Sequence, residues 1–267
     1  IICISTSIWE RPWGSRQQIM SRLSSGNRVL FVEYQFSFLD FLKFPQFLPR
    51  LFTPRIRYIN NNLMVYRPWL NLPFRYYNKV INLINQWLLL LQLKRLIRKF
   101  NFSKIILWTF EPASHFLVGK LNEKFSIFHC IDSIKDEKSI LMRKTCIEDI
   151  EEKLCKKCNI IFMSTSGSLS EKIKLNKNTY LLLSAVSESF FDVDFESLIS
   201  THSKKVNEIP RPRIGLIGTL NDRIDYELID FIAKSRPDWH IVLIGAITRK
   251  KIVNFLKGRK NIHLLGC

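Results

Sequence analysis

The sequence predicts an α/β protein built from two Rossmann-like units with parallel sheets, the second of them incomplete. Two features of its 267 residues indicate this class. Short apolar runs rich in Ile, Val, Leu and Phe alternate with longer segments of helical period, an order typical of parallel strands joined by helices. A proline-rich break then separates a first series of such units from a second, shorter series.

The strands are expected where apolar and β-branched residues form short runs. Several runs are apolar throughout, which predicts that helices cover both faces of the sheet. In chain order the predicted strands are Ile1–Ser5, Arg28–Glu33, Ile56–Ile59, Leu63–Tyr66, Ile105–Thr109, Ser126–Ile131, Ile160–Ser164, Thr179–Leu183, Arg213–Ile217, His240–Ile244 and Ile262–Leu265.

Helices are expected between most of these strands, where apolar residues recur with helical spacing. The predicted helices are Ser15–Ser24, Phe74–Phe100, Pro112–Leu121, Asp136–Lys157, Ser168–Lys174, Tyr226–Lys234 and Arg249–Leu256.

The alternation stops before Pro210 and Pro212, which stiffen an extended connector and cannot continue a helix. We therefore predict a first unit over residues 1–195 and the start of a second unit over 210–267. The chain begins inside one strand pattern and ends just after another, so we expect a fragment truncated at its C-terminus.

Basic residues are concentrated in the first part of the chain. The net charge is +18, and residues 1–110 hold 16 basic against 3 acidic residues, whereas residues 111–210 hold 14 against 15. Such an excess favours the binding of a polyanion, which could be nucleic acid, anionic lipid headgroups or the diphosphate of a nucleotide. An ordinary solvated surface is the alternative.

Several function classes are disfavoured by composition. The longest apolar stretches fall short of the roughly 20 residues that a membrane-spanning helix needs, and no signal-peptide pattern precedes Ile1. Six scattered cysteines suit a reducing cytoplasm. Cys155 and Cys158 have zinc-ligand spacing, but no second pair completes four ligands, so core packing is favoured and no metal is expected.

A glycine turn follows the predicted strand Arg213–Ile217. Gly215 and Gly218 have the spacing GxxG rather than the GxGxxG of dinucleotide-binding proteins, so no nicotinamide or flavin cofactor is expected. The turn and Arg223 could still hold a diphosphate, because backbone N–H groups, a helix N-terminus and a guanidinium all attract phosphate. The alternative is that this turn only connects the strand to the next helix and binds no phosphate.

Seven segments, taken together in their order and spacing, carry a resemblance to a known family. They are Trp9–Glu33, Ile105–Pro112, Cys130–Ser133, Glu151–Leu169, Pro212–Asp225, Arg236–Gly245 and Asn261–Gly266. The chain resembles the bacterial GT-B glycosyltransferases of the family 1-like group, which build surface polysaccharides from nucleotide sugars.

This resemblance implies a GT-B fold and a hexosyltransferase-like reaction, in which a sugar passes from a nucleotide diphosphate sugar to a glycan or lipid-linked acceptor without a cofactor. It implies that Gly218, Thr219 and Arg223 bind the donor diphosphate. The loop after the first strand would face the acceptor, where open α/β sheets bind ligands. Its candidate residues are Trp9, Arg11, Trp13, Gly14 and Arg16. A hydrophobic loop packed on the domain explains the same residues.

By analogy with this family, an acidic or histidine side chain of the first unit lies near the reacting carbon. Asp132 is the first candidate and His115 the second. Either residue also has an ordinary role, Asp132 as a helix cap and His115 as a half-buried helix residue. Glu111, before Pro112, is expected to cap a helix.

The segment from Phe36 to Phe52 is rich in Phe and Leu and is followed by Arg55 and Arg57. Apolar side chains beside cations suit a membrane interface, which predicts a cytoplasmic protein held peripherally on the inner face of the cell membrane. Contacts within the protein core explain the same residues.

Two other functions stay open. Where the family carries Asn-Gly-Val-Asp this chain has Ser184-Ala185-Val186-Ser187, and the carboxylate that holds the donor ribose would lie beyond Cys267. Both departures fit a non-catalytic remnant of the fold. A basic α/β protein that binds nucleic acid would explain the charge, but no recognised motif supports a nucleic-acid partner.

Overall fold

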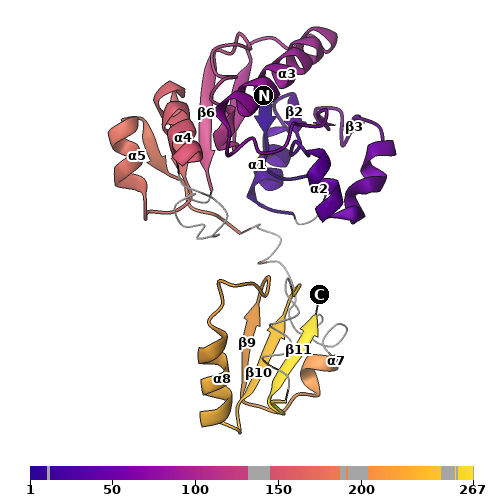
Figure 1. Cartoon of the computed structure of the whole chain (residues 1–267), viewed down its shortest axis with the longest axis vertical. Helices are drawn as coiled ribbons and strands as arrows, with labels where there is room; N and C mark the ends of the chain where they lie inside the picture. Colours follow the sequence, from indigo (N-terminus) through magenta and orange to yellow (C-terminus); the bar gives the residue numbers. More distant parts are fainter. Residues whose placement is uncertain are drawn as a thin grey trace. The chain divides into compact units, whose positions relative to one another are not determined.

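The computed structural model describes residues 1–10, 13–131, 145–186, 191, 204–247, 256 and 258–266. The chain divides into two compact units, Ile1–Ala185 and Val186–Cys267 (Figure 1). This division falls before the predicted limit at residue 195, and the domain limits 1–195 and 210–267 stay a prediction.

The first unit is built on an eight-stranded sheet with the order β3-β4-β2-β1-β5-β6-β7-β8. All neighbouring strands are parallel except β3 and β4, which are antiparallel. The strands are β1 (Ile2–Ile4), β2 (Val29–Val32), β3 (Ile56–Tyr58), β4 (Leu63–Tyr66), β5 (Ile106–Thr109), β6 (Phe125–Cys130), β7 (Ile160–Met163) and β8 (Thr179–Leu181).

Helices cover both faces of this sheet, as the apolar strands require. The α-helices are α1 (Ser15–Leu23), α2 (Phe38–Lys43), α3 (Lys79–Lys99), α4 (Thr145–Lys157) and α5 (Leu169–Leu175), and the 3₁₀ helices are η1 (Pro45–Phe52) and η2 (Pro112–Ser114). Leu89 and Leu93 of α3 pack with Ile2 and Ile4, whereas Met20 of α1 packs with Cys3. The side chains of β1 therefore alternate between two hydrophobic clusters, one on each face of the sheet.

Two helix predictions are wrong in their extent. The segment Pro112–Leu121 forms only the short η2, because the Ser114 hydroxyl bonds to Thr109 and to the Glu111 carbonyl, and Gly119 has φ of 84°. The predicted helix Phe74–Phe100 starts only at Lys79. Phe74 has φ of 65°, and the side chain of Asn78 caps α3 by accepting hydrogen bonds from the Val80 and Ile81 amides.

The second unit contains a parallel sheet with the order β11-β10-β9. Its elements are α7 (Lys204–Asn207), β9 (Arg213–Ile217), α8 (Tyr226–Ser235), β10 (His240–Ile244) and β11 (Ile262–Gly266). Ile229 and Ala233 of α8 pack on Ile241 and Leu243 of the sheet. Residues 136–144 and most of the predicted helix Arg249–Leu256 lie outside the described residues.

Two glycines meet where β9 and β10 end. Gly218 and Gly245 have φ of 153° and 145°, which residues with a side chain rarely adopt. A Cβ atom added to Gly245 would lie 1.8 Å from the Gly218 carbonyl oxygen. The Gly218 amide meanwhile donates to the Ile244 carbonyl at 2.9 Å, so the two turns are fixed against each other.

We predict that Gly245→Ala lowers the free energy of unfolding by roughly 1–3 kcal/mol, because the new methyl group can be placed only by moving the Gly218 backbone. The matched control is Gly215→Ala, since no heavy atom lies within 4 Å of a Cβ atom at Gly215. Urea denaturation of both variants measures the difference. Equal stability of the two variants would refute the close contact.

Candidate functional site

The carboxyl edge of the first sheet contains a topological switch point beside β1. The chain runs from β1 to β2 on one side, and β5 lies on the other side of β1. Loops that leave a parallel sheet at such a point diverge and form a crevice where ligands bind in open α/β folds. The loop after β1 and the residues after β2 and β5 therefore form the candidate site of this unit.

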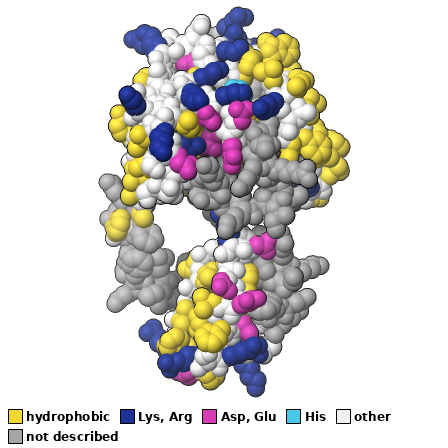
Figure 2. All heavy atoms as spheres, turned by 60° about the vertical axis from the view of Figure 1, so that its left-hand side comes forward, with side chains coloured by type: hydrophobic (Ala, Val, Ile, Leu, Met, Phe, Trp, Pro, Cys, Tyr) yellow, Lys and Arg dark blue, Asp and Glu magenta, His cyan; other side chains and the backbone are white. Residues whose placement is uncertain are grey.

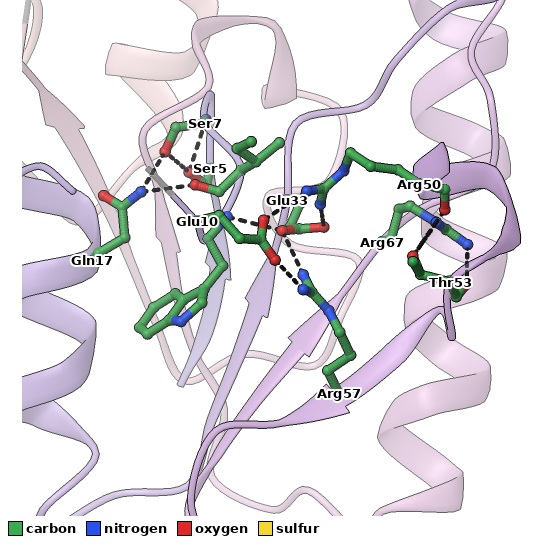
Figure 3. Close-up of polar contacts among 11 residues, drawn as sticks. Ser5, Ser7, Glu10, Gln17, Glu33, Arg50, Thr53, Arg57 and Arg67 are labelled. Atoms are coloured by element: carbon green, nitrogen blue, oxygen red, sulfur yellow. Dashed lines mark hydrogen bonds and ion pairs between the residues drawn. The ribbon is translucent and has the colours of Figure 1, made fainter. Parts of the chain in front are cut away.

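Glu33, directly after β2, is the centre of a buried ion cluster at this edge (Figure 3). Its side chain is 1% exposed and accepts hydrogen bonds from the Trp9 amide at 2.8 Å, Arg50 at 2.7 Å and Arg57 at 2.9 Å. These partners lie on the loop after β1, on η1 and on β3. One carboxylate thus joins three separate segments.

Glu10 completes this cluster by accepting hydrogen bonds from the same two arginines, including one from Arg50 at 2.6 Å. Burial alone would raise the pKa of Glu10, but the hydrogen bonds from Arg57 and Arg50 lower it to about 2. Two carboxylates and two guanidinium groups therefore neutralise one another. Beside them, Arg67 donates to the Thr53 hydroxyl at 2.8 Å and to its carbonyl at 2.6 Å (Figure 3).

The acceptor-side loop predicted from the sequence folds back onto the first turn of α1. Gln17 donates to the Ile8 carbonyl at 2.7 Å and accepts from the Gly14 amide at 3.1 Å. Trp9 is buried against Phe31, with ring centroids 5.0 Å apart, so it belongs to the core. Trp13 is 46% exposed and packs edge-on against Trp9.

Arg16 and His129 both lie against the ring of Phe110, which follows β5. Arg11 lies outside the described residues. The Arg16 guanidinium carbon is 5.7 Å from the centre of the Phe110 ring, and that ring also stacks on His129. Burial, with a smaller contribution from Arg16, lowers the pKa of His129 to about 4.

A second buried charged cluster follows β5. The Glu111 carboxylate accepts hydrogen bonds from Arg75 at 3.0 Å, from the Tyr76 hydroxyl at 3.0 Å and from the Ala113 amide at 3.0 Å. The Ala113 contact is the predicted cap. Arg75 and Tyr76 were missed by sequence reasoning, because they come from a loop 35–36 residues earlier in the chain and no motif marks them.

The two predicted catalytic residues lie in different situations. Asp132 is outside the described residues, and β6 before it ends at Cys130. His115 is half-buried after η2, and its carbonyl accepts a hydrogen bond from Lys157 of α4 at 3.3 Å. Burial and two lysines of α4 lower the pKa of His115. The described contacts of His115 are thus with α4 and not with the Glu33 or Glu111 clusters, and its catalytic role stays a prediction.

The predicted donor loop of the second unit follows β9. Gly218 and Leu220 donate their amide hydrogens to Ile244 and Ala246, each at 2.9 Å. Thr219 between them is exposed, and no hydrogen-bond partner of its amide lies among the described residues. The amide available to a phosphate is therefore that of Thr219.

Arg223 lies in a turn just before α8. Arg223 is exposed, and its amide donates to the Asn221 side chain at 2.9 Å. The N-terminus of α8 contributes less positive potential than the sequence predicted, because the Asp225 carboxylate already caps it by accepting from the Leu228 amide at 2.9 Å.

The described residues contain neither a candidate metal site nor a helix that could span a membrane. No group of three or more His, Cys, Asp or Glu side chains in this part of the chain could hold a metal ion. Burial raises the pKa of both Cys155 and Cys158 to about 12, and both side chains lie in the hydrophobic cluster between α4 and β7. No described helix combines the length and the hydropathy needed to span a bilayer.

Comparison with solved structures identifies the architecture. HepE from Anabaena in complex with UDP superposes with a TM-score of 0.64 at 12% identity, over 99% of this chain and 68% of that chain. The chain has the GT-B fold. Sucrose-phosphate synthase from Thermosynechococcus elongatus (TM-score 0.66, 12% identity) matches over 99% of this chain and 69% of its own. The catalytic domain of starch synthase IV from Arabidopsis thaliana, bound to ADP and acarbose, has a TM-score of 0.56 at 12% identity, over 100% and 73%.

No protein-family model matches this chain, and no curated protein sequence matches it. The GT-B fold confirms the predicted fold class, in which the second unit contains only part of a Rossmann-like domain.

We predict that stability falls as the pH is lowered from 6.5 to 4, because His129 takes up a proton near 6.5 when unfolded but only near 4 when buried. The loss amounts to up to roughly 3 kcal/mol over this range. His129→Phe, which can pack among Trp108, Phe110 and Phe162, should remove this part of the pH dependence. Urea denaturation at several pH values is the measurement, and an unchanged slope in the variant would contradict it.

Proposed function

We propose that this chain forms the acceptor side and the start of the donor side of a glycosyltransferase, which moves a hexosyl group from a nucleotide diphosphate sugar to a glycan or lipid-linked acceptor. The observation that carries the proposal is the turn Gly218–Arg223 at the end of β9, in a chain with the GT-B fold. Proteins of this fold have been solved with UDP, UDP-glucose and ADP.

The donor diphosphate is assigned to Thr219 and Arg223. A phosphate needs N–H donors that are not already used and a cation that water can reach. The Thr219 amide and the exposed position of Arg223 meet these two requirements, while Gly218 and Gly245 let the two turns approach each other. The diphosphate leaves with negative charge, so these groups stabilise the departing nucleotide as well as bind it.

The acceptor is assigned to the carboxyl edge of the first sheet. Trp13 offers an exposed aromatic face, on which sugar rings commonly stack, and Arg16, three residues further along the chain, offers a cation near the Phe110 ring. Asp132 is proposed to act at the reacting carbon, with His115 as the second candidate. The protein is proposed to work in the cytoplasm at the inner face of the cell membrane, where lipid-linked acceptors are found.

We predict that Arg223→Ala weakens binding of UDP or ADP by about ten-fold to a hundred-fold, since losing a charge-assisted contact costs roughly 1.5–3 kcal/mol. Arg236→Ala is the matched control. Arg236 follows the C-terminus of α8 and its guanidinium stacks on Trp239, so its removal leaves nucleotide affinity unchanged. Titration calorimetry on the complete protein makes the comparison. Equal affinities for both variants would refute the diphosphate assignment.

We predict that Asp132→Asn lowers the turnover number while leaving the dissociation constant of the nucleoside diphosphate within about two-fold, because Asp132 is assigned to the reacting carbon and not to the diphosphate. His115→Gln serves as the comparison for the second candidate. Release of nucleoside diphosphate from the donor measures turnover. Full turnover in Asp132→Asn would exclude that residue, and a loss confined to His115→Gln would transfer the role.

A further inference from the structure

The first half of helix α3 buries polar side chains and exposes apolar ones, whereas its second half buries Leu89 and Leu93 in the core. Asn82, Asn85 and Gln86, which interrupt the apolar sequence, are at most 1% exposed and face the protein. Five large apolar side chains on the opposite side are exposed, with Val80 at 64% and Trp87 at 51%. This α3 apolar face consists of Val80, Leu83, Ile84, Trp87 and Leu91, at the i, i+3, i+4 and i+7 spacing of one helical stripe.

The buried amides fix this orientation by binding the preceding loop. The Asn85 side chain accepts from the Leu72 amide at 2.8 Å and donates to the Leu72 carbonyl at 2.9 Å. Gln92 accepts from the Trp69 amide at 2.9 Å and from the Tyr66 hydroxyl at 2.7 Å. Turning the helix would leave these groups buried without partners, so the apolar stripe is held outward.

The same stripe continues as a cationic band toward the C-terminus of α3. Lys94, Arg95 and Arg98 follow Leu91 on the same helical face and are exposed. Helix α3 contains no Asp or Glu, and no acidic partner of these three side chains lies within the described part of the chain. The face thus combines a contiguous apolar surface with unneutralised positive charge.

Acidic residues nearby are already paired. Residues 1–110 contain only Glu10, Glu33 and Asp40. The first two are neutralised by Arg50 and Arg57, and Asp40 accepts hydrogen bonds from the Ser37 amide and hydroxyl. Lys79, at the start of α3, pairs with Asp149 at 2.6 Å, but Lys94, Arg95 and Arg98 have no acidic partner in the described part of the chain, so an external anionic surface can supply one.

We propose that the α3 apolar face lies on an anionic lipid bilayer, with Val80, Leu83, Ile84, Trp87 and Leu91 at the level of the headgroups and the upper acyl chains, and with Lys94, Arg95 and Arg98 against lipid phosphates. An aromatic and aliphatic stripe bordered by cations is what an interfacial helix requires. This contact is independent of glycosyl transfer, because neither group of residues belongs to the proposed donor or acceptor edge.

The proposal differs from the contact predicted at Phe36–Phe52. In that segment Phe36 and Phe41 are buried, whereas Phe38, Phe44 and Phe52 are exposed. Phe38→Ser with Phe44→Ser therefore tests that segment without disturbing the core, and it provides the comparison for α3.

The experiment is co-sedimentation of the complete protein with vesicles of phosphatidylcholine, with or without phosphatidylglycerol, at increasing salt. Trp87→Ser with Leu91→Ser should weaken binding to the anionic vesicles roughly ten-fold or more. Leu182→Ser with Leu183→Ser, which removes exposed apolar side chains after β8, should leave binding unchanged. Unchanged binding in the α3 variant would overturn the proposal, and so would a loss found only in the Phe38 and Phe44 variant.

Charge is tested separately, so that the result stands even where an apolar variant fails to fold. Arg95→Gln with Arg98→Gln should weaken binding and reduce its salt dependence, whereas Lys174→Gln with Lys177→Gln, which change exposed lysines in α5 and just after it, should not. Binding to neutral vesicles as strong as to anionic ones would overturn the proposal. Sedimentation velocity without lipid tests whether a second copy of this chain covers the α3 apolar face instead. Self-association that Trp87→Ser abolishes would show that it does and would overturn the proposal.

Discussion

The carboxylate of Glu33 is the interaction on which the carboxyl edge of the first unit depends. It is almost fully buried, and its three hydrogen-bond donors, the Trp9 amide, Arg50 and Arg57, come from three separate segments of the chain. An ionised carboxylate in such a place is tolerated only while its arginines and amide donor remain, and breaking a buried pair costs roughly 3–5 kcal/mol. Through these contacts the one carboxylate holds the loop after β1, η1 and β3 together at the proposed acceptor edge.

The same cluster explains why the surface of this unit is so unevenly charged. Two of the three acidic residues of the first 110 positions, Glu10 and Glu33, pair with Arg50 and Arg57, and Lys94, Arg95 and Arg98 of α3 have no acidic partner in the described part of the chain. The opposite is true of α4 and α5, where Figure 2 shows acidic side chains gathered beside basic ones. Ion pairs such as Lys153 with Asp149 and Lys156 with Glu152 neutralise that face. The first unit therefore has one face on which acidic and basic side chains pair, and another, on α3, on which Lys94, Arg95 and Arg98 have no acidic partner among the described residues.

The strands could be predicted to within two residues because each contains a short apolar run, and in β1, β2 and β4 every residue of that run is buried. The ion cluster could not be predicted. Arg50 and Arg57 follow Glu33 by 17 and 24 residues in the chain. No local sequence pattern indicates that η1 and the edge strand β3 bring these arginines to Glu33. Helix α3 shows a second limit, since no feature of the sequence marks Asn85 and Gln92 as buried, although both accept hydrogen bonds from backbone amides of the preceding loop.

In the second unit the sequence predicted the location of the glycine turn but not its hydrogen bonds. Gly218 and Thr219 were both predicted to bind phosphate, yet the Gly218 amide donates to the Ile244 carbonyl of the neighbouring strand, and the Thr219 amide has no hydrogen-bond partner among the described residues. Asp225 likewise occupies the helix N-terminus that the sequence assigned to the ligand. The hydrogen-bond partners of these backbone amides depend on which strands are neighbours in the sheet. Residue spacing alone does not predict that.

The most direct measurement of the proposed activity is hydrogen exchange of the complete protein with and without UDP or ADP. Binding at the assigned place should slow exchange in the segment 218–225, where the Thr219 amide and Arg223 lie, and leave helix α3 unchanged. A nucleotide that protects neither this segment nor the neighbouring turn at Gly245 would contradict the assignment of the donor site and, with it, the glycosyltransferase proposal.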